Sequence, residues 1–204
     1  MAIYALLDWD TVKKYDISIK EFCKTAKGLK AKILQYRDKN SSLEEKHNRL
    51  LEIKKHWKKT LIINDTVELL EYCDGIHIGQ EDLTSLSEKH SVSKEEVIKM
   101  LKNFKNKTKT VGLSTHNKEE IVIANGYDLD YIGLGAYRPT STKNTENIIG
   151  EKVIDLIKYS YHPVAVIGGV KIYDKIPSKF KVIGSDICRL TSSRLRKKKI
   201  FKTK

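Results

Sequence analysis

The chain has 204 residues, a length within reach of one α/β barrel, and 40% of them are hydrophobic, which excludes a chain that is disordered throughout. Lysine and arginine (39 together) outnumber aspartate and glutamate (26), and the formal charge of +13 favours anionic ligands, although most lysines are expected on solvated helix faces. Every apolar run is too short to cross a membrane, and three widely spaced cysteines favour reduced thiols, so we expect a cytoplasmic protein.

Short apolar runs alternate along the chain with charged stretches. In the stretches at residues 42–57 and 93–104 the apolar residues keep a helical spacing. Nearly continuous apolar strands between amphipathic helices indicate a parallel sheet with helices on its faces. Eight such runs predict a closed (β/α)8 TIM barrel, with an open, doubly wound sheet as the alternative. The expected strands are residues 3–8, 31–38, 60–65, 75–79, 110–115, 131–136, 163–169 and 181–185.

The chain shows one uniform composition up to a basic C-terminus. Because no linker or low-complexity segment divides it, we expect one domain over residues 1–204 with a basic tail at about residues 194–204. Phe201 is the one aromatic residue of this tail, which favours a solvated surface over a contact with nucleic acid. Neither a membrane nor a nucleic acid is therefore an expected partner, and a homo-oligomer is left open.

Polar or small residues follow nearly every expected strand. Asp8 ends the first strand, Asn64 and Asp65 end the third, and Ser114 lies at the end of the fifth. In a barrel, the carboxyl ends of all the strands meet at one rim, where active sites are built. We therefore expect these residues, far apart in the sequence, to meet around one site.

The second strand carries three polar side chains in alternation. Gln35, Arg37 and Lys39 are expected to face the site, while Tyr36 and Asp38 face the opposite way, because side chains alternate along a strand. Gln35 is expected to lie deepest. Together with Lys143 after the sixth strand, Arg37 and Lys39 would suit the oxygen atoms of a highly charged phosphate.

Two carboxylates follow neighbouring strands of the same region. Asp65 and Asp82 would suit Mg²⁺ bridging the protein to a diphosphate, since Mg²⁺ favours few carboxylates together with substrate oxygen atoms. The alternative is structural: Asp65 caps a helix at residues 66–73, and Asp82 begins a turn. The sequence spacing alone does not separate these two interpretations.

The last two strands end in small residues. Gly168 with Gly169, and Gly184 with Ser185, predict a second phosphate site, because barrels frequently bind phosphate after strands seven and eight. Two histidines are also candidates. His77 is expected to be a satisfied core residue, whereas His116 either donates a proton or caps the helix at residues 117–124.

Six segments in this order resemble the thiamine-phosphate synthase family, in which similar segments lie at the ends of barrel strands. The resemblance covers about residues 3–190 and rests on QYRDK, IIND, GIHIGQEDL, GLSTH, PTSTK and VIGGV. It implies a transferase that joins an aminopyrimidine methyl diphosphate to a thiazole phosphate with help from Mg²⁺. Such a reaction needs no nucleophilic side chain, because electrostatic stabilisation of the leaving diphosphate is sufficient.

The resemblance also implies a role for each matching residue. Asp65 and Asp82 would hold Mg²⁺, and the catalytic residues would be Arg37, Lys39, Ser114 and Lys143. The pyrimidine diphosphate would be bound by Gln35, Arg37, Lys39, Asn64, Ser114 and Lys143. The thiazole phosphate would be bound by Thr140, Ser141, Thr142, Gly169, Gly184 and Ser185.

The chain departs from the family pattern at two places. Tyr137 and Arg138 replace an apolar-aromatic pair, and Gly184 and Asp186 stand where a branched and a small residue are common. Asp186 would repel a phosphate if it faced inward. The alternatives to the synthase are thiazole tautomerase, a relative with a histidine at the position of His116, and a homologue that binds ligands without catalysis.

Overall fold

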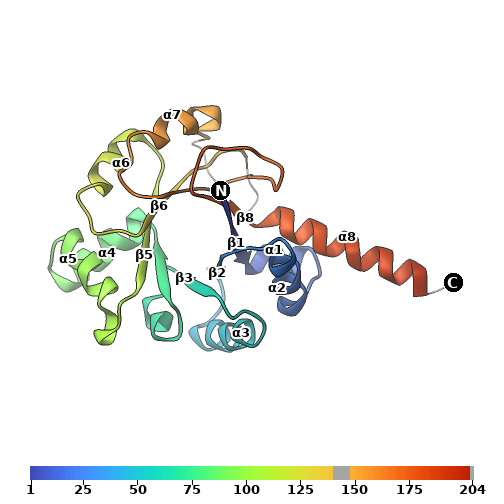
Figure 1. Ribbon diagram of the computed structural model, residues 1–204. Coiled ribbons are helices and arrows are strands. Elements are labelled where there is room, and N and C mark those ends of the chain that lie inside the picture. The colour runs from blue at the N-terminus through green and yellow to red at the C-terminus, as the bar shows by residue number, and fades with distance from the viewer. Residues whose placement is uncertain (140–147, 203–204) are drawn as a thin grey trace.

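The computed structural model describes residues 1–139 and 148–202, with side chains as far as Arg196, and its strands form a closed parallel barrel (Figure 1). Each strand pairs with the next along the chain, and β8 closes the circle on β1. The predicted TIM barrel is confirmed, and the open sheet is wrong. The strands are β1 (Ala2–Asp8), β2 (Ile33–Arg37), β3 (Thr60–Asn64), β4 (Gly75–Ile78), β5 (Thr110–Thr115), β6 (Tyr131–Leu134), β7 (Val164–Val166) and β8 (Phe180–Ile183).

Helices surround the barrel, and the two predicted from apolar spacing are present as α3 and α5 (Figure 1). Ser42 and Ser93 begin them, because each hydroxyl accepts a hydrogen bond from the amide three residues later. The helices are α1 (Trp9–Lys14), α2 (Ile19–Gly28), α3 (Leu43–His56), α4 (Gln80–His90), α5 (Lys94–Lys102), α6 (Lys118–Ala124), α7 (Val153–Ile157) and α8 (Ser185–Lys202). Short 3-10 turns are η1 (Val67–Tyr72), η2 (Phe104–Asn106) and η3 (Gly150–Lys152).

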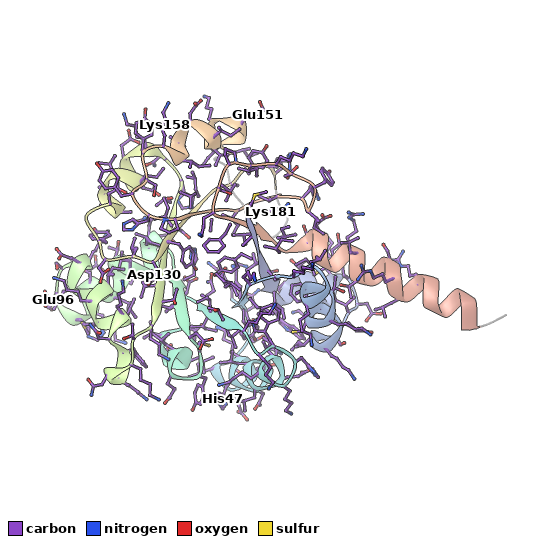
Figure 2. The ribbon with its side chains drawn as sticks, in the orientation of Figure 1. His47, Glu96, Asp130, Glu151, Lys158 and Lys181 are labelled. Carbon is purple, nitrogen blue, oxygen red and sulfur yellow. The ribbon has the colours of Figure 1, made fainter. Side chains whose placement is uncertain are left out.

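The alternation of strand side chains gives two apolar layers. Leu7, Leu34 and their equivalents face outward and pack beneath the helices. Charged residues such as Glu96 on α5 and Lys158 just after α7 lie at the periphery, away from the barrel axis (Figure 2). The inner layer fills the barrel itself and consists of Tyr4, Leu6, Ile33, Ile62, Tyr131, Ala165 and Val182.

One position on β5 makes room for an aromatic ring from β6. A Cβ on Gly112 would lie 2.1 Å from Cζ of Tyr131, closer than any side chain can approach. The Tyr131 ring therefore occupies the volume that a side chain on β5 would have filled. Tyr4 and Phe180 meet this ring edge to face, so that aromatic residues form the middle of the barrel.

The connection from β7 to β8 is held by polar contacts in place of a helix. Residues 167–179, all of them described, form turns and bends. The buried ammonium group of Lys181 (Figure 2) donates to the carbonyl groups of Ile172 and Asp174 in this connection. Beyond β8, α8 begins against the barrel and its C-terminal half extends away from it (Figure 1). Among the described helices, none is long and apolar enough to span a membrane.

Candidate active site

Residues at the carboxyl ends of the strands line a pocket of about 350 Å³. Its wall contains every predicted site residue that the structure describes: Gln35, Arg37, Lys39, Asn64, Asp65, Asp82, Ser114, Gly169, Gly184 and Ser185. The remaining predicted residues, Thr140, Ser141, Thr142 and Lys143, lie outside the described residues. The expectation that distant strand ends meet around one site is therefore met for the described part of the chain.

A buried carboxylate holds Arg37 at the pocket wall. Nη1 of Arg37 lies 2.5 Å from Oδ2 of Asp8, which ends the neighbouring strand β1. The other oxygen of Asp8 caps α1, since it accepts hydrogen bonds from the amide (2.9 Å) and the hydroxyl (2.6 Å) of Thr11. Asp8 is 3% exposed. The ion pair therefore fixes one edge of the guanidinium group from the neighbouring strand.

Gln35 lies deeper than Arg37, as the strand order predicted. Gln35 is 2% exposed, whereas the side chain of Arg37 is 13% exposed and Lys39 lies at the surface. Nε2 of Gln35 donates to Oδ1 of Asn64 at 2.9 Å, which orients both amides. The pocket thus changes from neutral amides in its depth to cations near its mouth.

The opposite face of β2 contacts the surrounding helices. The Tyr36 hydroxyl donates to Asp38 at 2.9 Å, and Arg49 of α3 donates to the same carboxylate at 2.8 Å. Burial alone would raise the pKa of Asp38, but hydrogen bonds from Tyr36 and Ser41 and the charge of Arg49 lower it below its ordinary value. The predicted alternation along residues 35–39 is confirmed, since Asp38 serves the scaffold and not the pocket.

Two carboxylates share the part of the pocket beside Gly79. A Cβ on Gly79 would lie 2.7 Å from Oδ2 of Asp82 and 3.9 Å from Oδ1 of Asp65, so glycine leaves room for both. Burial and the charge of Asp82 raise the pKa of Asp65, while the Gly79 amide and the charges of Lys39 and Arg37 oppose that increase. The pair therefore concentrates negative charge that a bound cation would relieve.

The structural alternative for these carboxylates is wrong for Asp65. Thr66 occupies the cap position of η1, and Asp65 accepts a hydrogen bond from the Gly79 amide (3.1 Å) and another from the Asn64 side chain. Asp82 lies in the first turn of α4, where a negative charge is favourable, and it also reaches the pocket wall.

Four side chains form a hydrogen-bonded row from the barrel interior to the pocket. The hydroxyl groups of Tyr4 and Tyr131 are 2.8 Å apart, and the Tyr131 hydroxyl lies 3.1 Å from Nδ1 of His77. Nε2 of His77 lies 3.0 Å from the Ser114 hydroxyl. His77 is therefore the satisfied, buried histidine that was predicted, although it also lines the pocket. Burial raises the pKa of Tyr4 and of Tyr131, so both hydroxyls keep their protons.

His116 lines the pocket together with a carboxylate that orients it. Nδ1 of His116 lies 2.9 Å from Oε2 of Glu120, and the His116 amide donates to the same oxygen at 2.8 Å. Asn117, not His116, caps α6 by accepting a hydrogen bond from the Glu120 amide. The capping role suggested for His116 is therefore wrong, and its ring is held in one orientation at the pocket wall.

The far side of the pocket is formed largely by backbone. Gly168 and Gly169 have φ values of +90° and +63°, a conformation that favours glycine. A Cβ on Gly169 would lie 2.7 Å from Cβ of Arg138, so the loops after β6 and β7 pack directly together. Ser185 is the first residue of α8, an 18-residue helix whose amides are directed toward the pocket end.

The departures from the family pattern have structural roles. Arg138 forms a two-pronged ion pair with Asp174, at 2.5 and 3.0 Å, and so joins the loop after β6 to the connection between β7 and β8. Asp186 is 2% exposed and accepts hydrogen bonds from the Ile172 amide and from Arg189. Asp186 is thus turned away from the pocket, and the repulsion expected from an inward-facing carboxylate does not arise.

The sequence interpretation assigned no role to Asp8 or Glu120 as orienting groups. Asp8 pairs in register with Arg37 across neighbouring strands, so the contact follows from the pairing of β1 with β2. Glu120 lies four residues after His116 at the start of a helix, a spacing that brings side chains together. Both signals depend on knowing which strands and helix turns are neighbours.

The chain matches known proteins over most of its length. The family model for thiamine monophosphate synthase matches residues 10–175. The thiamine-phosphate synthase of Persephonella marina is 36% identical over 146 residues, 69% of this chain and 64% of the relative. That of Dictyoglomus turgidum is 34% identical over 170 residues (79% and 70%), and that of Clostridioides difficile is 33% identical over 175 residues (83% and 76%). The chain thus spans less than two thirds of the first of these relatives.

Solved structures share the barrel at lower identity. Thiamine phosphate pyrophosphorylase from Pyrococcus furiosus has a TM-score of 0.66 at 17% identity and covers 95% of this chain and 96% of its own. (S)-3-O-geranylgeranylglyceryl phosphate synthase from Thermoplasma acidophilum has a TM-score of 0.61 at 14% identity, with coverages of 92% and 86%. These likenesses show the fold alone. The family model and the curated relatives show more, and they confirm the resemblance of the six segments: the chain belongs to the thiamine monophosphate synthase family.

Proposed function

We propose that the chain is a thiamine-phosphate synthase. It would couple 4-amino-2-methyl-5-(diphosphomethyl)pyrimidine with thiazole phosphate, carboxylated or plain, to give thiamine phosphate and diphosphate. The observation that carries this proposal is one pocket in which Arg37 and Lys39 lie beside the carboxylate pair of Asp65 and Asp82. Cations and a metal-binding pair on the same wall suit a diphosphate, since each neutralises part of its charge.

The residues beside Gly79 fit Mg²⁺. Asp65 and Asp82 offer carboxylate oxygen atoms, and the raised pKa of Asp65 indicates negative charge that is not fully compensated. Mg²⁺ held there would polarise the diphosphate oxygen atoms and leave the remaining positions to water and substrate. The Gly79 amide and the Asn64 side chain orient the Asp65 carboxylate, while Arg37 and Lys39 hold the diphosphate from the neighbouring strand.

The reaction proceeds by substitution at the pyrimidine methylene. The bond from the methylene carbon to the diphosphate oxygen breaks, both electrons leave with diphosphate, and the resulting cation is stabilised by the aminopyrimidine ring. The lone pair of the thiazole nitrogen then forms the new carbon–nitrogen bond. Negative charge grows on the diphosphate in the transition state, so Arg37 and Lys39 stabilise that state more than the bound substrate. Gln35, Asn64 and Ser114 would position the neutral pyrimidine.

The thiazole phosphate would bind on the backbone side of the pocket. Gly169, Gly184 and Ser185 line it, and the first amides of α8 carry the positive end of a helix dipole. Thr140, Ser141, Thr142 and Lys143 would complete the two substrate sites from outside the described residues.

A direct assay tests the proposal. Pure protein, Mg²⁺ and both substrates are mixed, and thiamine phosphate and diphosphate are measured together. We expect equal amounts of the two products, and we expect excess chelator to abolish them because the Asp65 and Asp82 charges then repel the diphosphate. Turnover that continues in chelator would refute the metal assignment. Binding of both substrates without products would identify a non-catalytic homologue.

The pair of His116 and Glu120 favours one second candidate, the thiazole tautomerase. A histidine oriented by a carboxylate can move a proton between two atoms of a bound carboxythiazole phosphate. Under that function, His116→Ala would remove isomerisation while Arg37→Ala and Lys39→Ala would spare it. If the chain is the synthase, Lys143→Ala costs far more coupling rate than His116→Ala, and the reverse order would favour the tautomerase.

A further inference from the structure

The hydrogen-bonded row Tyr4–Tyr131–His77–Ser114 runs from the apolar interior of the barrel to the pocket. The surroundings of Tyr4, its buried end, determine which group of each pair donates. Each of the three contacts needs one donor and one acceptor, and each tyrosine hydroxyl carries one proton. A neutral imidazole carries one N–H, on either Nδ1 or Nε2. The row therefore has two possible arrangements. Either each group donates to the next one in the direction from Tyr4 to Ser114, or each donates in the direction from Ser114 to Tyr4.

The surroundings of Tyr4 separate the two orders. Its side chain is 1% exposed and lies in the inner apolar layer with Leu6, Ile33 and Val182. Among the described residues, the Tyr131 hydroxyl is the hydrogen-bond partner of the Tyr4 hydroxyl. If Tyr4 accepted from Tyr131, its own proton would be buried without an acceptor, which is costly. If Tyr4 donates, only a lone pair remains without a partner, which is the smaller cost.

The remaining bonds then follow in one direction. Because the Tyr131 hydroxyl accepts from Tyr4, its own proton goes to Nδ1 of His77 at 3.1 Å. Nδ1 is thus an acceptor, so the imidazole proton lies on Nε2 and is donated to the Ser114 hydroxyl oxygen at 3.0 Å. The Ser114 proton is left for a partner in the pocket, whose wall includes Ser114.

We propose that this row, the Tyr4 relay, fixes Ser114 as a hydrogen-bond donor to the ligand and so selects ligands that present an acceptor atom there. A ring nitrogen of an aminopyrimidine is such an acceptor, whereas a C–H or N–H at the same position leaves the Ser114 proton unpaired. The identity of this ligand rests on the proposed function, while the proton order rests on the buried tyrosines alone. Neither Tyr4 nor Tyr131 lines the pocket, so both act as positioning residues.

The first arm of the test reads the proton order without substrate. A long-range ¹H–¹⁵N spectrum of the full chain assigns the His77 tautomer at neutral pH. We expect the Nε2–H form in the unmodified protein and a gain of the Nδ1–H form in Tyr131→Phe, in which the donor to Nδ1 is gone. Tyr36→Phe is the matched control, because it removes a buried tyrosine hydroxyl from the outer face of the barrel. A dominant Nδ1–H form in the unmodified protein overturns the relay.

The second arm measures selection by Ser114. Binding of 4-amino-5-hydroxymethyl-2-methylpyrimidine is compared with two analogues, in each of which one ring nitrogen is replaced by C–H. We expect one analogue to bind about 10-fold more weakly, the usual cost of an unpaired buried donor, and we expect Ser114→Ala to remove that difference. Equal binding of all three compounds overturns the selection role. Failure of the coupling assay alone would refute the synthase and leave the tautomer result standing.

Discussion

The two halves of the pocket rim differ in the groups that they present to a ligand: one presents mainly side chains and the other mainly backbone. The β1–β4 half contains charged and amide side chains, among them Arg37, Asp65 and Asp82, the first two of which are oriented by hydrogen bonds. The β6–β8 half, as far as it is described, is made of backbone at Gly169 and Gly184 and of the start of α8. Arg138, which pairs with Asp174 and donates to the Gly169 carbonyl at 3.3 Å, supports that backbone.

This difference predicts how each half responds to substitution. In the side-chain half, the group that would touch the ligand and the group that orients it are both side chains, so single substitutions remove a charge directly. In the backbone half, the amides that would touch the ligand cannot be removed by substitution, and only their supports can be changed. We therefore expect large effects on rate in the first half and moderate effects on affinity in the second.

The largest effect is expected at Arg37. Arg37→Ala should lower kcat by roughly 30- to 1000-fold, because charge develops on the diphosphate as its bond breaks and a charge-assisted contact is lost. Arg37→Lys should recover only part of the rate, since it keeps the charge and loses the fork. Asp38→Asn is the control on the opposite face of β2 and should keep kcat close to that of the unmodified protein. If Asp38→Asn were inactive while Arg37→Ala kept full activity, the face of β2 assigned to the pocket would be the wrong one.

A smaller loss is expected at Asp8, the support of Arg37. Asp8→Asn keeps a residue that can cap α1 but removes the charge beside Arg37, and we expect kcat to fall by about 10-fold. Combined with Arg37→Lys, the loss should be less than the product of the two separate losses, because both act through one guanidinium group. Thr11→Val is the matched control: it should lower the melting temperature and leave kcat unchanged. Fully additive losses would mean that Asp8 acts independently of Arg37.

In the backbone half, we expect a change in KM rather than in kcat. Arg138→Met removes the ion pair with Asp174, whose carboxylate is nearly buried, and should raise KM for the thiazole phosphate by about 3- to 10-fold. KM for the pyrimidine diphosphate should stay the same. Lys158→Met breaks an exposed ion pair at the C-terminal end of α7 and serves as the control for lost surface charge. An equal rise in both KM values would show that the two halves are not independent.

The smallest expected effect is a change in melting temperature that depends on pH. In chelator at neutral pH, Asp82→Asn should raise the melting temperature by roughly 1–3 °C relative to Glu81→Gln, because Asp82 raises the pKa of buried Asp65 and so disfavours its charged form. Glu81→Gln corrects for the loss of a negative charge in the first turn of α4. A carboxyl whose pKa is raised on folding destabilises the fold above its ordinary pKa, so the gain should shrink as the pH falls through the raised pKa and vanish below the ordinary one. A gain that persists in acid would have another origin.

More of the side-chain half of the site than of the backbone half could be predicted from the sequence. Alternation along β2 predicted that Gln35 and Arg37 share a face, and the barrel topology predicted that Asp65 and Asp82 meet, because both arguments need only periodicity and strand order. The support of Arg37 by Asp8 and the outward turn of Asp186 were not predicted. Both depend on which of several nearby donors a carboxylate reaches, a matter of angstroms that spacing along the chain does not encode.

Gly112 and Tyr131, which share one volume across β5 and β6, have a consequence for how this barrel can diverge. Any side chain on Gly112 would collide with the ring, and loss of the ring without a larger residue on β5 would leave a void. During evolution, these two residues can therefore be replaced only together. A protein with one of the two substitutions would have either a steric clash or a cavity inside the barrel. The Tyr131 ring also carries the hydroxyl that contacts His77. The difficulty of replacing Tyr131 by single substitutions therefore also preserves the His77 side of the pocket.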